Sequence, residues 1–416
     1  MFTTGLVLLA FSGHWEELGV PGPLDRGLMV VGVLMCGADL ARSGQRFVVR
    51  PVHLVLLVSG LYVLASAAVA GTLSGTGLYA LVDRWGVGLY LASIGAAVVY
   101  RDATNRRMLL VGLTMLGLYL GVTAVLEQVA SELVWPSYLV DPEVGLHFGR
   151  SRGPYVEGVA NGLMLICCGA AAAALSLGRW TRHRGLAGLV VLLCLAGAAL
   201  TLTRAVWIAA IVAIVVCGVL VPRVRRVTVR FLPLGALAAA LLVTLVPGFL
   251  QVADERAVDL YPVWDRINTN VAAVRMVESS PAFGIGWLRS SEDMVDYVRQ
   301  TASAPVSTSS GTVEIHNVFL SRAAETGLVG FAVWLGTLVM VVGHALLRRP
   351  DRPGGQLMRG VLLVVVTSWF VAALLGPVPY AQPNYVLWVL AGAVLSEYMI
   401  TDRCAPVTAP REASHA

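Results

Sequence analysis

The sequence of 416 residues contains no lysine, and all thirty of its basic residues are arginine. A Walker P-loop, a Schiff-base lysine and a lysine general base are therefore excluded. Charged residues of both signs are also scarce. They make up 13% of the chain, against roughly a quarter in a typical soluble domain. Such a chain has too little polar surface to coat a water-facing globule, so the composition argues against a soluble protein.

Cysteine and metal-binding patterns are also poorly represented. Five of the six cysteines lie in apolar runs and Cys404 lies near the end of the chain, with no CxxC spacing. This distribution argues against a disulfide framework or a zinc site. The sequence has no DxD or HExxH motif, and its acidic loop residues have no metal-ligand spacing. We therefore expect no metal and no cofactor.

What the chain does contain is apolar sequence in long runs, with 57% hydrophobic residues and a mean hydropathy of +0.76. Runs long enough, or nearly so, to cross a hydrocarbon core of about 30 Å recur twelve times. They lie at about 2–14, 27–41, 51–73, 85–100, 108–128, 155–178, 185–202, 205–221, 231–250, 318–346, 359–376 and 384–400. The sequence thus predicts an all-α polytopic membrane protein with about twelve transmembrane helices in a single transmembrane domain, 1–416.

Arginine clusters occupy alternate connections between these apolar runs, and further arginines lie in the C-terminal tail. By the positive-inside rule those connections, both termini and the tail 401–416 are expected to be cytoplasmic. The net charge of +5 is explained in the same way, so we do not expect a nucleic-acid partner. The largest polar segment, 251–315, lies between the ninth and tenth spans and is predicted to be an extracytoplasmic loop of short helices joined by a mobile segment.

The most informative local pattern lies at the start of the tenth run. His316 and Asn317 are followed by nine residues and then by Gly327-x-x-Gly330. A continuous helix through this pattern would hold His316 about 16 Å outward of Gly327, and the glycines would allow another helix to pack closely. A lone interfacial histidine is more often a helix cap or a loop hydrogen-bonding group than a catalyst. Arg322 and Glu325, three residues apart, are interpreted as a structural ion pair.

Several arginines are candidate ligands of an anionic group. Arg204 follows Thr203 in a tight turn between two apolar runs, where it could equally snorkel to lipid headgroups. Arg266 lies in the long loop, with Arg275 and Arg289 as weaker candidates, and each alone would usually be a solvated charge. A further group contains Arg152, Tyr155 and Asn161 at the entry to the sixth run, where Gly153-Pro154 is otherwise an ordinary helix start.

Together, the histidine pattern, the Thr-Arg turn and the Gly284-Ile285-Gly286 triplet of the loop resemble the motifs of the O-antigen ligase and polymerase family. The resemblance runs from Arg152 to Phe331, and Phe331 departs from the small residue or tyrosine usual after the second glycine. It implies a GT-C-like membrane enzyme that transfers a glycan, with inversion and without metal, from an undecaprenyl diphosphate carrier to an acceptor hydroxyl on the outer face of the bacterial cytoplasmic membrane.

The resemblance also implies roles for particular residues. His316 would be the catalytic base, because a neutral imidazole has a pKa near working pH. Arginines would stabilise the charge that grows on the departing diphosphate. The residues expected to bind diphosphate or substrate are Arg204, Arg266, Arg275, Arg289, Arg152, Tyr155 and Asn317. The partners would be a lipid-linked glycan donor, a lipid or glycan acceptor and membrane lipids.

Alternatives stay open at this point. Ligase and polymerase differ only in the acceptor, and the motifs do not separate them. A transporter with twelve helices would be expected to show two halves of six spans with polar interruptions at mid-membrane, whereas polarity here is concentrated in one late loop. A peptidoglycan-type polymerase would be expected to carry an essential loop aspartate, for which Asp254, Asp259 and Asp265 offer no matching context.

Overall fold

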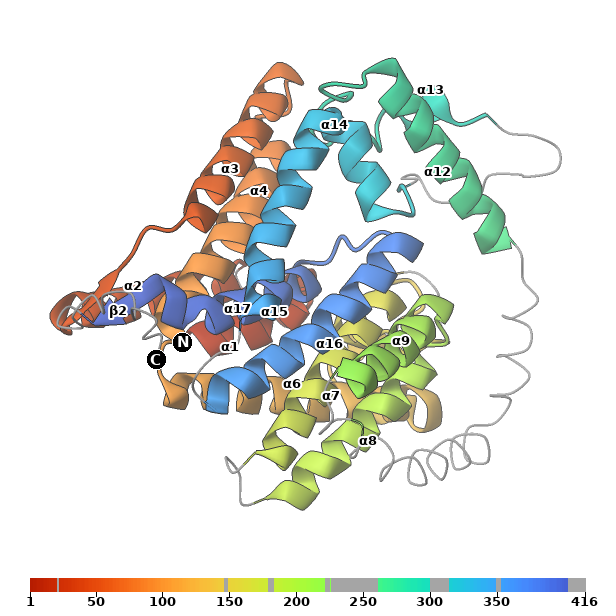
Figure 1. Cartoon of the computed structure of the whole chain (residues 1–416). Helices are drawn as coiled ribbons and strands as arrows, with labels where there is room; N and C mark the ends of the chain where they lie inside the picture. Colours follow the sequence, from red (N-terminus) through yellow and green to blue (C-terminus); the bar gives the residue numbers. More distant parts are fainter. Residues whose placement is uncertain are drawn as a thin grey trace.

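A computed structural model of the chain describes residues 1–20, 22–145, 149–178, 183–220, 225, 261–299, 314–348 and 353–402, and these residues are mostly helical (Figure 1). Two three-residue strands, β1 (Gln45–Phe47) and β2 (Ile400–Asp402), pair antiparallel and join the end of the chain to its first quarter. The α-helices are α1 (Phe2–Leu8), α2 (Leu24–Arg42), α3 (Pro51–Val69), α4 (Thr76–Leu81), α5 (Ala96–Val99), α6 (Ala103–Val129), α7 (Gly158–Leu177), α8 (Arg184–Leu200), α9 (Arg204–Leu220), α12 (Tyr261–Ser279), α13 (Met294–Tyr297), α14 (Val318–Leu338), α15 (His344–Leu347), α16 (Pro353–Leu375) and α17 (Ala381–Met399).

Two π-helical segments, η3 (Val82–Gly95) and η7 (Val339–Gly343), join neighbouring α-helices into longer rods. Six helices of the described part are long and apolar enough to cross a membrane: Pro51–Val69, Thr76–Val99, Ala103–Val129, Gly158–Leu177, Val318–Leu347 and Gly354–Leu375. The π-helical segments belong to two of these, Thr76–Val99 and Val318–Leu347. Three shorter apolar helices are Phe2–Phe11, Arg184–Leu200 and Arg204–Leu220. The predicted run 231–250 lies outside the described residues, so the count of twelve spans stays a prediction.

The centre of the bundle is α7, which packs against α6, α8 and α16 (Figure 1). Its sequence is rich in glycine and alanine, so neighbouring backbones approach closely. A Cβ atom added at Gly169 would lie 3.2 Å from Cβ of Cys194 on α8. At the start of α7 the Glu157 carboxylate accepts a hydrogen bond of 2.7 Å from the Ala160 backbone and caps the helix.

The long loop was predicted to hold only short helices, but α12 is 19 residues long. It packs against α14, and α13 packs against α12 (Figure 1). The buried side chains at this contact include Ala272, Ala273 and Met276 on α12 and Ala324 on α14. The small alanines allow the two helices to approach, and this contact positions the side chains described below. The Ser/Thr-rich stretch 301–312 lies outside the described residues.

The prediction of a straight helix through the glycine pattern is wrong. Gly327 has φ 66° and ψ −179°, which breaks α14 into two segments that Figure 1 shows at a clear angle. Residues other than glycine rarely adopt this backbone conformation. His316 therefore lies at the end of the shorter, first segment rather than about 16 Å along a continuous rod.

The break at Gly327 is filled by the loop segment that follows α12. The Leu328 amide donates to the Pro281 carbonyl (2.8 Å), and the Ile285 amide donates to the Ala324 carbonyl (2.9 Å). Gly284 and Gly327 touch backbone to backbone, so a Cβ atom at either would overlap the other segment. The two glycine motifs are thus halves of one contact, which satisfies the backbone groups freed by the break.

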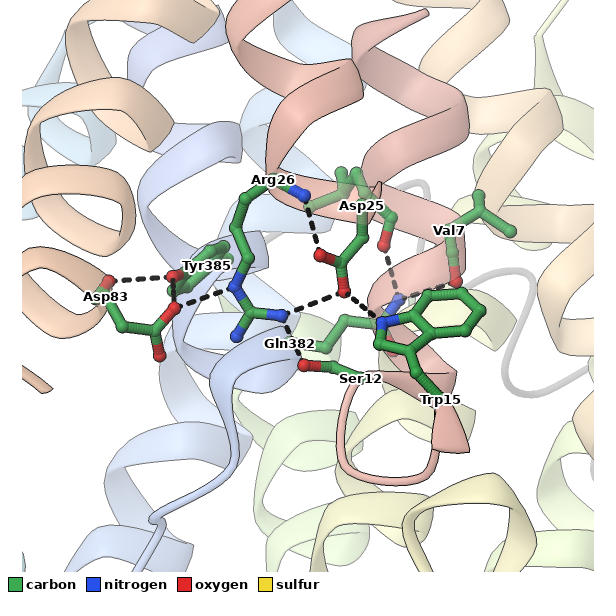
Figure 2. A network of polar contacts seen from close by, with 9 residues as sticks. Val7, Ser12, Trp15, Asp25, Arg26, Asp83, Gln382 and Tyr385 are labelled. Atoms are coloured by element: carbon green, nitrogen blue, oxygen red, sulfur yellow. Dashed lines mark hydrogen bonds and ion pairs between the residues drawn. The ribbon is translucent and has the colours of Figure 1, made fainter. Parts of the chain in front are cut away.

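A buried polar network connects the first helices to α17 (Figure 2). Arg26 forms ion pairs of 2.8 Å with Asp25 and with Asp83 of η3. Tyr385 of α17 donates a hydrogen bond of 2.6 Å to the Asp83 carboxylate, and the Trp15 indole donates to Asp25 at 3.3 Å. Charges in an apolar interior require such partners. The network therefore fixes α2, η3 and α17 relative to one another.

Candidate active site

His316 lies in the last turn before α14, facing α12. The side chain of Asn317 accepts hydrogen bonds from the amides of Phe319 (2.9 Å) and Leu320 (3.1 Å) and so caps α14. Asn317 was a candidate substrate ligand, and its side-chain oxygen is engaged in this cap. The cap fixes the backbone that carries the neighbouring imidazole.

The imidazole of His316 meets Thr269 of α12, with Nδ1 and the threonine Oγ1 3.3 Å apart. The Thr269 hydroxyl is also 3.0 Å from the Asp265 carbonyl and 3.2 Å from the Arg266 carbonyl. Carbonyls only accept hydrogen bonds, so the hydroxyl proton points to them and Oγ1 accepts from Nδ1–H. This assignment leaves Nε2 with the free lone pair.

The groups around the imidazole shift the pKa of His316 in opposite directions. Partial burial lowers the pKa of His316, the carboxylate of Asp265 raises it, Arg266 lowers it again, and the Glu314 carbonyl raises it. The pKa lies below 6.5 after these opposing effects. The ring is therefore predominantly neutral at pH 7, as a proton acceptor must be.

Arg266 and Arg204, predicted separately from the sequence, lie close enough to repel each other. Burial and the positive charge of Arg204 lower the pKa of Arg266, and Asp265 opposes them. Arg266 also acts on His316, so it is coupled electrostatically both to Arg204 at the start of α9 and to the imidazole before α14. Two guanidinium groups held together in this way are suited to a ligand with more than one negative charge.

Three buried polar atoms on α12 make no hydrogen bond within the described part of the chain: Oδ1 of Asp265, Nε of Arg266 and Oδ1 of Asn270. Buried polar atoms in proteins are nearly always paired. All three belong to side chains within two turns of one helix, next to Thr269. A bound ligand would supply the missing partners.

The two weaker loop candidates have partners of their own. Arg275 donates a hydrogen bond of 2.9 Å to the Tyr297 carbonyl and connects α12 to the end of α13. Arg289 forms an ion pair of 3.2 Å with Asp293 and is exposed. These contacts with Tyr297 and Asp293 do not direct either guanidinium toward His316.

The candidates at the entry to α7 hold the loop before it. The Arg152 side chain is 1% exposed and donates to the carbonyls of Val144 (2.7 Å), Leu139 (2.9 Å) and Asp141 (3.0 Å). Tyr155 is also buried and donates a hydrogen bond to the Gln382 side chain of α17. These contacts support a structural role for both residues.

A cavity of ≈ 190 Å³ lies beside the His316 segment, between η3, α14 and α17. Glu314 and Ile315, which directly precede His316, form part of its wall. Arg322 and Glu325 also line it and form the ion pair expected from their spacing, at 3.4 Å. The Ser290 hydroxyl donates to the other oxygen of Glu325 (2.8 Å).

Sequence reasoning missed Thr269, the electrostatic role of Asp265 and the cavity. Thr269 is an ordinary helix residue in the sequence, and only the packing of α12 on α14 brings it to His316. Asp265 and Arg266 had been noted as neighbours, and the turn spacing from 265 to 269 could have suggested a shared face. In the described residues, no cluster of three or more His, Cys, Asp or Glu side chains is arranged to hold a metal ion.

The apolar helices and the site described above define a polytopic α-helical membrane protein with a histidine coupled electrostatically to an arginine of α12. Residues 189–335 match the family described as O-Antigen ligase, which confirms the resemblance over that stretch. Arg204, Arg266 and His316 all lie within it. The match supports a ligase or polymerase type of function, and the family implies glycan and lipid-linked substrates in a membrane. A comparison with curated proteins gives no match.

Proposed function

We propose that the protein is an O-antigen ligase-like glycosyltransferase. It moves a glycan from undecaprenyl diphosphate to an acceptor hydroxyl on the outer face of the bacterial cytoplasmic membrane. The observation that carries the proposal is the contact of 3.3 Å between Thr269 and Nδ1 of His316. It is joined by the electrostatic coupling of Arg266 to both His316 and Arg204. The family match over the same residues supports it.

The chemistry is a single displacement at the anomeric carbon. The acceptor oxygen attacks that carbon from the face opposite the diphosphate and forms the new glycosidic C–O bond. At the same time the bond between the anomeric carbon and the diphosphate oxygen breaks. The proton of the acceptor hydroxyl passes to Nε2 of His316, and the electron pair of the broken bond leaves on the diphosphate. Such base catalysis contributes about 100-fold or more. The configuration at the anomeric carbon is inverted.

The arginines stabilise the leaving group. Both Arg204 and Arg266 contact the diphosphate oxygens as negative charge grows on them. Nε of Arg266 makes no hydrogen bond in the described part of the chain. Each well-placed donor of this kind contributes about 3 kcal/mol in a water-poor site. The diphosphate is already an activated leaving group, so the reaction requires neither a nucleotide nor a metal ion. Ligase and polymerase use this same site and differ in the acceptor.

The test is a reconstituted assay with the full chain in liposomes, an undecaprenyl-diphosphate-linked oligosaccharide as donor and candidate acceptors. His316→Ala is expected to reduce transfer at least about 100-fold, whereas EDTA leaves it unchanged. His344→Ala is the matched control, because His344 lies in α15 and contacts Tyr398 instead. A single added glycan identifies a ligase, and a ladder of longer products identifies a polymerase. Full transfer by His316→Ala would sink the proposed function.

A further inference from the structure

The cavity beside the His316 segment combines flat aromatic faces with groups that bind hydroxyls. Four tryptophans line it: Trp85, Trp334, Trp369 and Trp388. The Trp369 indole donates a hydrogen bond of 2.8 Å to Asn384, and Phe319 packs edge-on against Trp334 with ring centroids 5.6 Å apart. These contacts fix the aromatic walls before any ligand arrives. A preformed aromatic wall favours a ligand that has an apolar face.

The charged groups of the cavity nearly cancel. Two of its three carboxylates are paired within the protein, Asp83 with Arg26 at 2.8 Å and Glu325 with Arg322 at 3.4 Å. The remaining two charges, Arg84 and Glu314, interact electrostatically with each other. A balanced set of this kind has no excess positive charge for a diphosphate. Its carboxylate and guanidinium groups instead match the donors and acceptors of hydroxyl groups.

Size and position restrict the ligand further. The cavity volume of ≈ 190 Å³ is below the roughly 300–1,000 Å³ of sites that enclose drug-sized ligands, which limits the occupant to about one ring. Glu314 in its wall is two residues from His316, so their backbones are at most about 7 Å apart. The cavity is therefore placed for the second substrate.

We propose that this cavity binds one pyranose ring of the acceptor glycan. The C–H face of the ring packs on the tryptophans, and its hydroxyls bind Glu314 and Arg84. The proposal rests on the proposed function, since it names the acceptor of that reaction as a sugar hydroxyl presented to His316. It makes Trp334, Arg84 and Glu314 residues that select the acceptor, distinct from those that bind the diphosphate.

Binding is measured first, without catalysis. The purified full chain is titrated with methyl glycopyranosides of glucose, galactose, mannose and N-acetylglucosamine, and tryptophan fluorescence is recorded. At least one glycoside is expected to bind, and Trp334→Ala is expected to weaken it about tenfold, which corresponds to about 1.4 kcal/mol. Phe331→Ala is the matched control. Because Phe331 packs on Trp334 with ring centroids 6.1 Å apart, a second control is Trp135→Ala. Trp135 is 66% exposed and is not part of the cavity wall, so this variant is expected to bind like the parent.

Kinetics then separate the acceptor site from the donor site. Trp334→Ala and Arg84→Gln are expected to raise the acceptor KM about tenfold while leaving the donor KM unchanged. Arg84 is exposed, so Arg84→Gln is expected to fold. This variant can therefore test the acceptor site even if Trp334→Ala does not fold. His316→Ala is expected to bind the glycoside like the parent and to reduce transfer at least about 100-fold.

The outcomes distinguish the two proposals. If no glycoside binds, the cavity is not an acceptor site. The same holds if glycoside binding and the acceptor KM are equal in the parent, Trp334→Ala and Arg84→Gln. In both cases the proposed function stands if His316→Ala is inactive. If His316→Ala keeps full transfer, the proposed function fails, and the acceptor role of the cavity fails with it even where glycoside binding depends on Trp334.

Discussion

Thr269 Oγ1 lies 3.3 Å from Nδ1 of His316 and orients the ring so that Nε2 carries the lone pair. We expect Thr269→Val to reduce kcat about tenfold, because the lost hydrogen bond allows the ring to rotate and the proton to move to Nε2. Thr269→Ser keeps the hydroxyl and is expected to keep most of the activity. The measurement is steady-state transfer at saturating donor. Equal activity of the valine and serine variants would contradict the tautomer assignment.

The pH dependence of transfer depends on the charges around the same ring. The base must be neutral, so kcat/KM falls as pH decreases through the pKa of His316, which burial holds below 6.5. The negative charge of Asp265 raises this pKa, so Asp265→Asn is expected to move the acidic limb of the profile to lower pH. Arg266→Gln removes a positive charge and is expected to move it to higher pH. Shifts in the same direction in both variants would exclude His316 as the titrating group.

Arginines with different surroundings are expected to respond differently to substitution. Arg266→Gln removes a half-buried guanidinium coupled to Arg204 and is expected to reduce kcat/KM for the lipid-linked donor at least about 100-fold. Arg289→Gln breaks only an exposed ion pair with Asp293 and is expected to change kcat/KM less than about twofold. Comparable losses in the two variants would show that the loop arginines act together, contrary to the structure.

Sequence patterns predicted most helices because apolar runs of sufficient length leave few alternatives, and the runs at 108–128 and 318–346 fall within the helices at Ala103–Val129 and Val318–Leu347. They also made His316, Arg204 and Arg266 candidates, since short motifs carry these residues, and the roles of these residues stay a prediction. They could not predict the break at Gly327 or the role of Thr269. Both depend on how α12 and the loop after it pack on α14, a contact between segments about forty to fifty residues apart in the sequence.

The contact between Gly284 and Gly327 makes a stability prediction. Gly284→Ala and Gly327→Ala each force a Cβ atom into the opposing backbone and also strain a positive φ. We expect each to lower the free energy of unfolding by about 1–3 kcal/mol or more. Gly336→Ala, later in α14, meets nothing within 4 Å and is expected to be neutral or slightly stabilising. Thermal unfolding in detergent compares the three variants. A destabilised Gly336→Ala with an unaffected Gly327→Ala would contradict the contact.

The buried network around Arg26 supports the wall of the cavity, because its partner Asp83 lines it. Arg26→Met leaves Asp25, which is 0% exposed, without its ion-pair partner, and we expect it to destabilise the fold by about 3–5 kcal/mol. Adding Asp25→Asn and Asp83→Asn to the same chain removes both buried charges and is expected to restore much of that loss.

Asp39→Asn is the matched control for this network. It removes an ion pair with Arg101 in which the aspartate side chain is 72% exposed, and it is expected to cost less than about 1 kcal/mol. Chemical denaturation of the solubilised protein measures all three variants. If the triple variant were no more stable than Arg26→Met, uncompensated charge would not explain the loss. Packing of the Arg26 side chain between α2, η3 and α17 would then be the main contribution of the network.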